Sequence, residues 1–134
     1  MPNITYAREW LQLAKRNLET ARLLLREDHF TYSIAIELQQ TIEKTFKAIY
    51  AFYGISIPKT HALPVLYNFV SEKIPFDEFE IDDIITISDY YETDRYPGPR
   101  YVIPSRSEVE HFFLFAEKLY KQIDAVIDHH SPMP

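Results

Sequence analysis

The longest uninterrupted amphipathic pattern of the chain lies between Ser33 and Gly54. Apolar side chains recur there every three or four residues, at Ile34, Leu38, Ile42, Phe46, Ile49 and Tyr53. This spacing predicts one long α-helix with a buried stripe. Gly54 is expected to end the helix, because glycine adopts the left-handed conformation of a helix C-terminus without steric cost. The polar side is expected to carry Glu37, Gln40, Lys44 and Lys47, with Glu43 placed to pair with Lys47 one turn later.

An earlier helix is predicted from about Thr5 to Glu27, where Ala7, Ala14 and Ala21 recur at intervals of seven residues. Small side chains on one face allow a second helix to approach closely. We therefore expect the first two helices, which a short turn joins, to pack against each other. The outward row of this first helix is expected to be Lys15, Glu19, Arg22 and Arg26.

Two shorter helices are predicted next, and prolines mark their limits. Pro58 keeps the segment before the third helix extended, Pro64 is tolerated in its first turn, and Pro75 ends it. Asp77 and Glu80 then form an acidic version of a capping box, which predicts the start of a fourth helix. The core face of that helix is expected to hold Ile81, Ile84, Ile85, Ser88 and Tyr91.

A capping box is also predicted at the start of the last helix, with Ser107 as the N-cap and Glu110 three residues later. The apolar seam of this helix runs through Val109, Phe112, Ala116, Leu119, Ile123 and Val126. Its apolar face is wider than a thin bundle covers, which favours a contact between two copies. The sequence thus predicts an all-α, up-and-down bundle of about five helices, one domain over residues 1–134, without a sheet and with a frayed tail.

Composition narrows the possible chemistry. The 134 residues include no cysteine, which excludes disulfides, thiolate metal sites and a cysteine nucleophile. Only two glycines are present, so a glycine-rich phosphate loop is excluded, and no zinc-ligand cluster or Ser-His-Asp order appears. We expect no cofactor and no metal. Without a signal-peptide pattern or an apolar run long enough for a bilayer, we expect a cytoplasmic protein without membrane contact.

The charge is unevenly distributed along a chain whose net charge is −6. Eight acidic residues and no basic one lie between Asp77 and Asp94, and three arginines and no acid follow up to Ser107. Overall acidity argues against a protein that coats nucleic acid. The loop that begins at Tyr90 combines tyrosines with Arg95, Tyr96 and Arg100, which suits phosphates and bases. Alternatively, its tyrosines pack on the bundle and its arginines pair with the acidic helix.

The segment QQTIEKTFKA, from Gln39 to Ala48, resembles the second-helix pattern of HEPN domains. The resemblance continues through Gly54, the Thr60-His61-Ala62-Leu63 step and Asp94-Arg95-Tyr96-Pro97, in the family's order. It implies a homodimeric HEPN bundle that binds nucleotide or nucleic-acid phosphate and works with a minimal nucleotidyltransferase partner in a toxin–antitoxin-type pair. His61 is then a candidate ligand contact, or alternatively a helix cap or packing residue. Ala62 departs from the family pattern, which usually has an acidic residue there.

The resemblance also implies a second possibility, a metal-independent endoribonuclease. HEPN ribonucleases use an Arg and a His with four to six residues between them, contributed by two subunits to one site, and Arg106 and His111 fit this spacing. Arg22 and His29 fit it as well, but they lie on the first helix and its turn. If Ser107 is the N-cap, Arg106 and His111 become neighbours, one to hold the phosphate and one to act as general base. Ser107 stands where many of these ribonucleases have Asn, Asp or His.

Overall fold

The computed structural model describes residues 3–93 and 103–129, and this part of the chain is folded into five helices without a strand. The helices are α1 (Ile4–Arg26), α2 (Thr31–Tyr53), α3 (Leu63–Lys73), α4 (Glu78–Thr93) and α5 (Arg106–His129). The all-α prediction is therefore confirmed. The predicted tail after the last helix lies outside the described residues.

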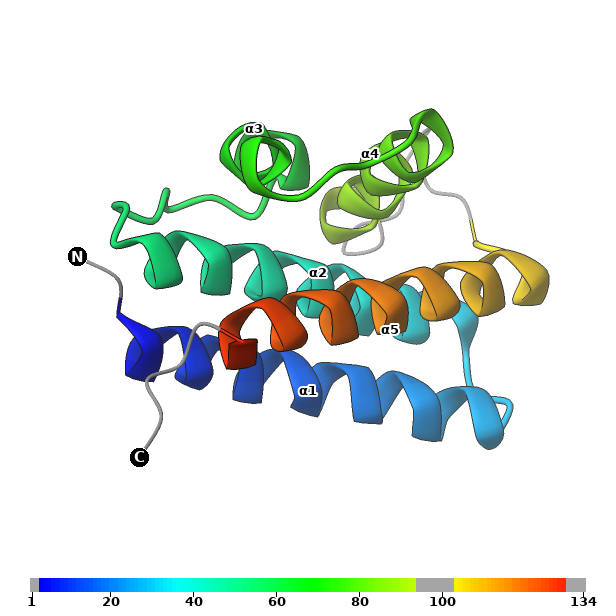
Figure 1. The fold of residues 1–134 in the computed structure, drawn as a ribbon. Coiled ribbons are helices and arrows are strands. Elements are labelled where there is room, and N and C mark those ends of the chain that lie inside the picture. The colour runs from blue at the N-terminus through cyan, green and yellow to red at the C-terminus, as the bar shows by residue number, and fades with distance from the viewer. Residues whose placement is uncertain (1–2, 94–102, 130–134) are drawn as a thin grey trace.

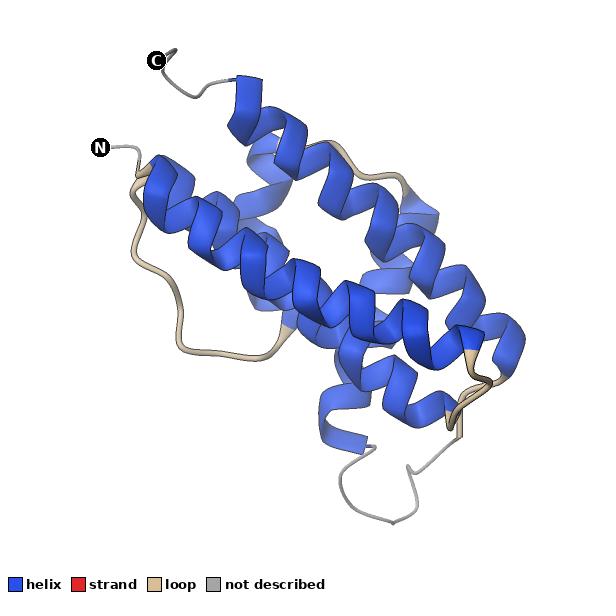
Figure 2. Cartoon of the chain, turned by 90° about the horizontal axis from the view of Figure 1, so that it is seen from below, coloured by secondary structure: helices blue, strands red, loops and turns tan. Residues whose placement is uncertain are grey.

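The long helix α2 lies at the centre of the bundle (Figure 1). It contacts all four other helices, with α1 and α5 running alongside it and α3 and α4 on the side away from α1. Figure 2 shows the same arrangement from the side of α1. Because α2 has neighbours on several sides, its side chains are buried on nearly every face from Ile42 to Phe52.

The contact between α1 and α2 depends on small side chains. Ala7, Ala14 and Ala21 are all fully buried, as their seven-residue spacing predicts. At the end of α2, Gly54 has φ of 69°, the left-handed conformation that glycine adopts most easily. Arg22, expected in an outward row, instead bridges two helices, because its guanidinium bonds Glu117 of α5 at 2.7 Å and lies over the Phe113 ring.

The predicted capping box of α4 is confirmed. The backbone N–H of Asp77 donates to Glu80 at 3.1 Å, and the N–H of Glu80 donates to Asp77 at 2.8 Å. The expected core face of this helix was partly wrong, because Ile85 is 48% exposed. The fully buried positions are Ile84, Ile87 and Tyr90. α4 packs through this narrower stripe, and Ile85 lies beyond its edge.

The predicted capping of α5 is wrong by two residues. The helix begins at Arg106, and the Ser105 hydroxyl accepts the Glu108 N–H at 3.1 Å, so Ser105 rather than Ser107 is the N-cap. Two serines in alternate positions offered the same pattern, and the chain uses the one that directly follows Pro104, whose side chain is buried. Arg106 is consequently the first residue of the helix rather than the residue before its cap.

Candidate functional site

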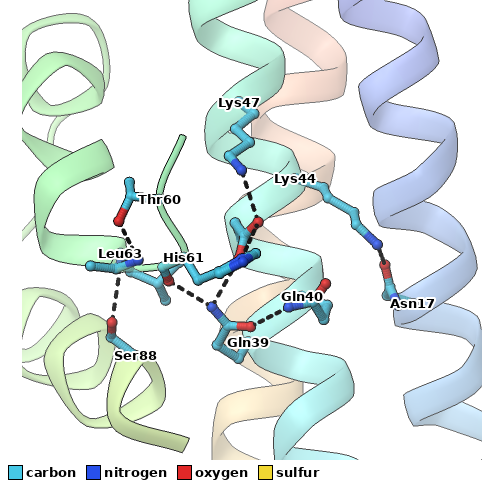
Figure 3. Close-up of polar contacts among 11 residues, drawn as sticks. Asn17, Gln39, Gln40, Lys44, Lys47, Thr60, His61, Leu63 and Ser88 are labelled. Carbon is cyan, nitrogen blue, oxygen red and sulfur yellow. Dashed lines mark hydrogen bonds and ion pairs between the residues drawn. The ribbon is translucent and has the colours of Figure 1, made fainter. Parts of the chain in front are cut away.

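A buried carboxylate, that of Glu43, lies in the middle of α2 beside three polar side chains. Figure 3 shows these three side chains, Lys47, Gln39 and His61. The Glu43 side chain is 4% exposed. It accepts bonds from Lys47 Nζ at 2.9 Å and Gln39 Nε2 at 3.1 Å, and His61 Nδ1 lies 3.0 Å from it. Removing an ion pair from water costs several kcal/mol per ion before the pairing offsets it, so such a group requires close partners.

Lys47 corrects the expected polar side of α2. The side chain is only 10% exposed, and its ammonium lies 5.6 Å from the centre of the Trp10 ring as well as beside Glu43. The sequence correctly predicts the pairing of Glu43 with Lys47. It misplaces the pair at the surface, because the neighbours of α2 cover this face.

The backbone around His61 is held by bonds from two helices. Gln39 of α2 donates to the His61 carbonyl at 2.9 Å, and Ser88 of α4 accepts the Leu63 N–H at 2.9 Å. The Thr60 hydroxyl accepts the Ala62 N–H at 3.1 Å. α3 has Ala62 as its N-cap and no side-chain cap, so His61 does not cap the helix. Its ring bonds a buried side chain instead.

The part of the His61 ring that does not contact Glu43 borders a cleft. The Tyr91 ring stacks on it, with the ring centres 4.2 Å apart and the planes 23° from parallel. The His61 side chain is 53% exposed. The cleft has a volume of about 430 Å³ and is lined by Lys59, Thr60, His61, Ala62, Pro64, Ser88, Asp89 and Tyr91. An imidazole, an aromatic face and an ammonium group thus meet in one opening.

Within one chain, Arg106 and His111 do not meet. The guanidinium of Arg106 donates to the Leu25 carbonyl at 2.6 Å, pairs with Asp28 at 2.6 Å, and bonds Glu110 at 2.9 Å. The imidazole of His111 faces α4 instead. Five residues of helix rotate a side chain by about 140° beyond one full turn, so the two point to different neighbours. The expected contact between them depended on the wrong N-cap and is not found.

His111 lies at a second, smaller cleft, between α4 and α5. Its Nε2 is 2.8 Å from the Asp83 carboxylate, and its side chain is 62% exposed. The cleft is about 250 Å³ and is lined by Asp77, Phe79, Glu80, Asp83, His111, Leu114, Phe115 and Lys118. Phe79 and Leu114 are 81% and 64% exposed. This face therefore combines an oriented imidazole with exposed apolar surface.

The model of the HEPN domain family matches residues 7–126 of this sequence. The chain belongs to the HEPN family. A protein of Methanocaldococcus jannaschii named "Putative toxin MJ1304" is 29% identical over 103 residues, which cover 72% of this chain and 67% of that protein. The HEPN assignment thus agrees with the resemblance carried by the α2 pattern.

Two crystal structures show the same HEPN fold. TT1696 from Thermus thermophilus superimposes with a TM-score of 0.72 at 23% identity, covering 89% of this chain and 96% of its own. ST0689, an archaeal HEPN homologue, superimposes with a TM-score of 0.66 at 20% identity, covering 90% and 97%. At these identities the likeness concerns the fold.

The sequence of this HEPN chain also predicted ligand or partner contacts at Arg95, Tyr96 and Arg100. These three residues lie outside the described residues. Among the residues that are described, no group of three or more His, Asp or Glu side chains is placed to hold a metal ion. None of the helices in that part of the chain has the length and apolar character needed to cross a membrane.

Sequence reasoning did not identify Glu43, Gln39 or Tyr91 as part of a site around His61. A signal was present for two of them, because Gln39 and Glu43 lie within the QQTIEKTFKA segment that carries the HEPN resemblance. Residues four positions apart lie on the same face of a helix, so both side chains could take part in one network. Periodicity alone placed Lys47, the expected partner of Glu43, on the polar side of the helix and assigned Gln39 to neither side.

Proposed function

We propose that this HEPN protein is the toxin-like member of a toxin–antitoxin-type pair, and that its His61 cleft binds the phosphate-bearing part of a nucleotide or nucleic acid. A minimal nucleotidyltransferase is the proposed partner. The observation that carries the proposal is the buried Glu43 network that holds His61 at the cleft. A buried ion pair contributes little net stability, so its placement beside an exposed imidazole favours a role in ligand binding.

The lining of the cleft suits such a ligand. Stacked His61 and Tyr91 offer aromatic surface to a base, and Lys59 offers a cation to a phosphate. We propose that Arg95, Tyr96 and Arg100, which follow Tyr91 in the sequence, add guanidinium and aromatic contacts to the same ligand or to the partner. The toxin name of the M. jannaschii relative supports the toxin-like part of the proposal.

Calorimetric titration with AMP and with a short single-stranded RNA tests the binding. We expect His61→Ala and Arg95→Ala each to weaken binding about tenfold or more, because each removes a contact to the ligand. His129→Ala and Arg16→Ala are the matched controls, since both positions are exposed and outside the cleft. Unchanged affinity in His61→Ala, or no binding of either probe to the wild-type chain, would refute the proposed site.

The partner is tested separately. A small nucleotidyltransferase encoded next to this chain, co-expressed with a tagged copy of it, is expected to co-purify in a stable complex. We expect Arg95→Ala to weaken that complex if the loop faces the partner, and Arg16→Ala to leave it intact. Separate elution of the two proteins would remove the nucleotidyltransferase from the proposal without affecting the ligand test.

A second candidate, the metal-independent endoribonuclease, is favoured by the pairing of His111 with Asp83. A carboxylate 2.8 Å from Nε2 orients the imidazole and leaves Nδ1 to take a proton from a ribose 2′-hydroxyl. In this function Arg106 holds the scissile phosphate. Because the two side chains contact different helices of one chain, the site requires a second subunit, as the family resemblance implies.

RNA cleavage in EDTA tests this second function. We expect the wild-type chain to cleave single-stranded RNA without a metal, and His111→Ala to lose the activity because the base is removed. His129→Ala, at the other end of α5, is the matched control. Equal cleavage by His111→Ala and the wild-type chain would eliminate this candidate, and intact RNA after incubation with the free wild-type protein would do the same.

A further inference from the structure

The two nitrogens of the His61 ring have different surroundings. Nδ1 lies 3.0 Å from one oxygen of Glu43 and 3.2 Å from the other. Nε2 has no hydrogen-bond partner among the described residues, and the ring borders the open cleft. We infer that Glu43 is a positioning residue that keeps a proton on Nδ1, so that the neutral form of the His61 ring presents Nε2 to the ligand as a hydrogen-bond acceptor.

The direction of the bonds around Glu43 follows from its neighbours. The ammonium of Lys47 only donates, so the carboxylate beside it accepts. The amide of Gln39 is oriented independently, because the His61 carbonyl can only accept and must face its Nε2 at 2.9 Å. The same Nε2 then donates to Glu43 at 3.1 Å. Glu43 is therefore an acceptor toward every neighbour, and His61 Nδ1 must donate to it.

The neutral imidazole carries one proton, so a proton fixed on Nδ1 leaves a lone pair on Nε2. The stacked Tyr91 ring fixes the plane of the imidazole, and Glu43 fixes its rotation within that plane. The group that meets His61 must then donate a hydrogen bond. On a ribonucleotide both the sugar hydroxyls and the amino group of the base can donate; we assign a sugar hydroxyl to His61, while the phosphate is left to Lys59, on the same cleft. This part of the inference rests on the proposed function.

Nitrogen NMR of the histidine rings at pH 8, without any ligand, tests the positioning role. We expect His61, assigned by comparison with His61→Ala, to carry its proton on Nδ1. In Glu43→Met/Lys47→Met both members of the buried ion pair are gone, and His61 should change toward the Nε2–H form of free histidine. Glu9→Gln, an exposed change on α1, should leave the signals unaltered. An Nε2–H form in the wild-type chain, or an unchanged His61 in the double variant, overturns the inference.

The ligand test first compares two ligands on the wild-type protein, and that comparison does not depend on any variant folding. AMP should bind about tenfold more tightly than 2′,3′-dideoxy-AMP, the effect of one lost hydrogen bond. His61→Ala should bind the two ligands equally, which a purely structural role of the network would not produce. Equal binding by the wild-type chain overturns the hydroxyl assignment. If neither ligand binds, the proposed function and that assignment fall together, and the NMR result alone decides whether Glu43 positions His61.

Discussion

Replacing Lys47 by methionine probes the buried ion pair of α2 directly. Methionine preserves much of the length of the side chain and removes the charge, which leaves the Glu43 carboxylate buried with the Gln39 amide and His61 as its remaining partners. Removing one member of a buried pair typically costs about 3 to 5 kcal/mol, because the other charge loses its compensation. Two donors remain here, so we expect the lower end of that range, about 3 kcal/mol.

Urea unfolding followed by far-UV circular dichroism measures this cost. In a thermal unfolding experiment on a chain of this length, a loss of 3 kcal/mol should also lower Tm by roughly 10 °C. The double variant Glu43→Met/Lys47→Met should recover most of the loss, because an apolar pair leaves no buried charge. Lys118→Met is the matched control, since its side chain is 68% exposed and should change stability by less than about 0.5 kcal/mol.

A cost below about 1 kcal/mol for Lys47→Met would refute the argument, because it would mean that water reaches Glu43 or that the carboxylate does not depend on Lys47. Equal stability of the single and double variants would refute it in a second way. In that case the loss would come from packing against Trp10, whose ring lies 5.6 Å from the ammonium, rather than from the uncompensated charge.

Three further predictions concern the bundle. Arg106→Ala should lower the free energy of unfolding by about 1 to 2 kcal/mol in urea titrations, because it removes the bond to the Leu25 carbonyl and two exposed ion pairs, whereas exposed Arg26→Ala should cost much less. Fully buried Leu38→Ala should cost about 2 to 5 kcal/mol in the same assay, and a cost under 1 kcal/mol would contradict its place in the core. Light scattering should give twice the chain mass of 15.9 kDa for the wild-type protein and the single mass for Leu114→Glu, if exposed Leu114 of α5 and Phe79 of α4 join two copies.

The fold was predictable because each helix has a strong local signal. The alanine spacing of α1, the stripe of α2 with Gly54 at its end and the Asp77–Glu80 capping box all correspond to observed contacts. Periodicity does not predict the structure where two neighbouring residues fit the same local pattern equally well. Ser105 and Ser107 both offer a capping hydroxyl, and the stripe of α4 can shift sideways to exclude Ile85. Tertiary packing decides such cases.

The candidate site was predictable only in part, because it depends on distances in space. His61 was a candidate from the family resemblance, but its partner Glu43 lies 18 residues earlier in the chain. A glutamate and a lysine four residues apart form the same local pattern whether they are solvated or buried. The buried pair differs from a solvated one because α3 and the segment before it lie over this part of α2. The sequence near Glu43 does not show which segments will cover it.

The helix α4 connects the two candidate functions, and this affects how they can be separated. Ser88 and Tyr91 hold the His61 side, while Asp83 of the same helix bonds His111 on α5. A substitution that shifts α4 would therefore disturb both clefts, and its loss of activity would assign neither. His61→Ala and His111→Ala change only the two rings, one beside Tyr91 and the other beside Asp83. Loss of nucleotide binding in the first and of RNA cleavage in the second would therefore be independent results, and each would bear on one function alone.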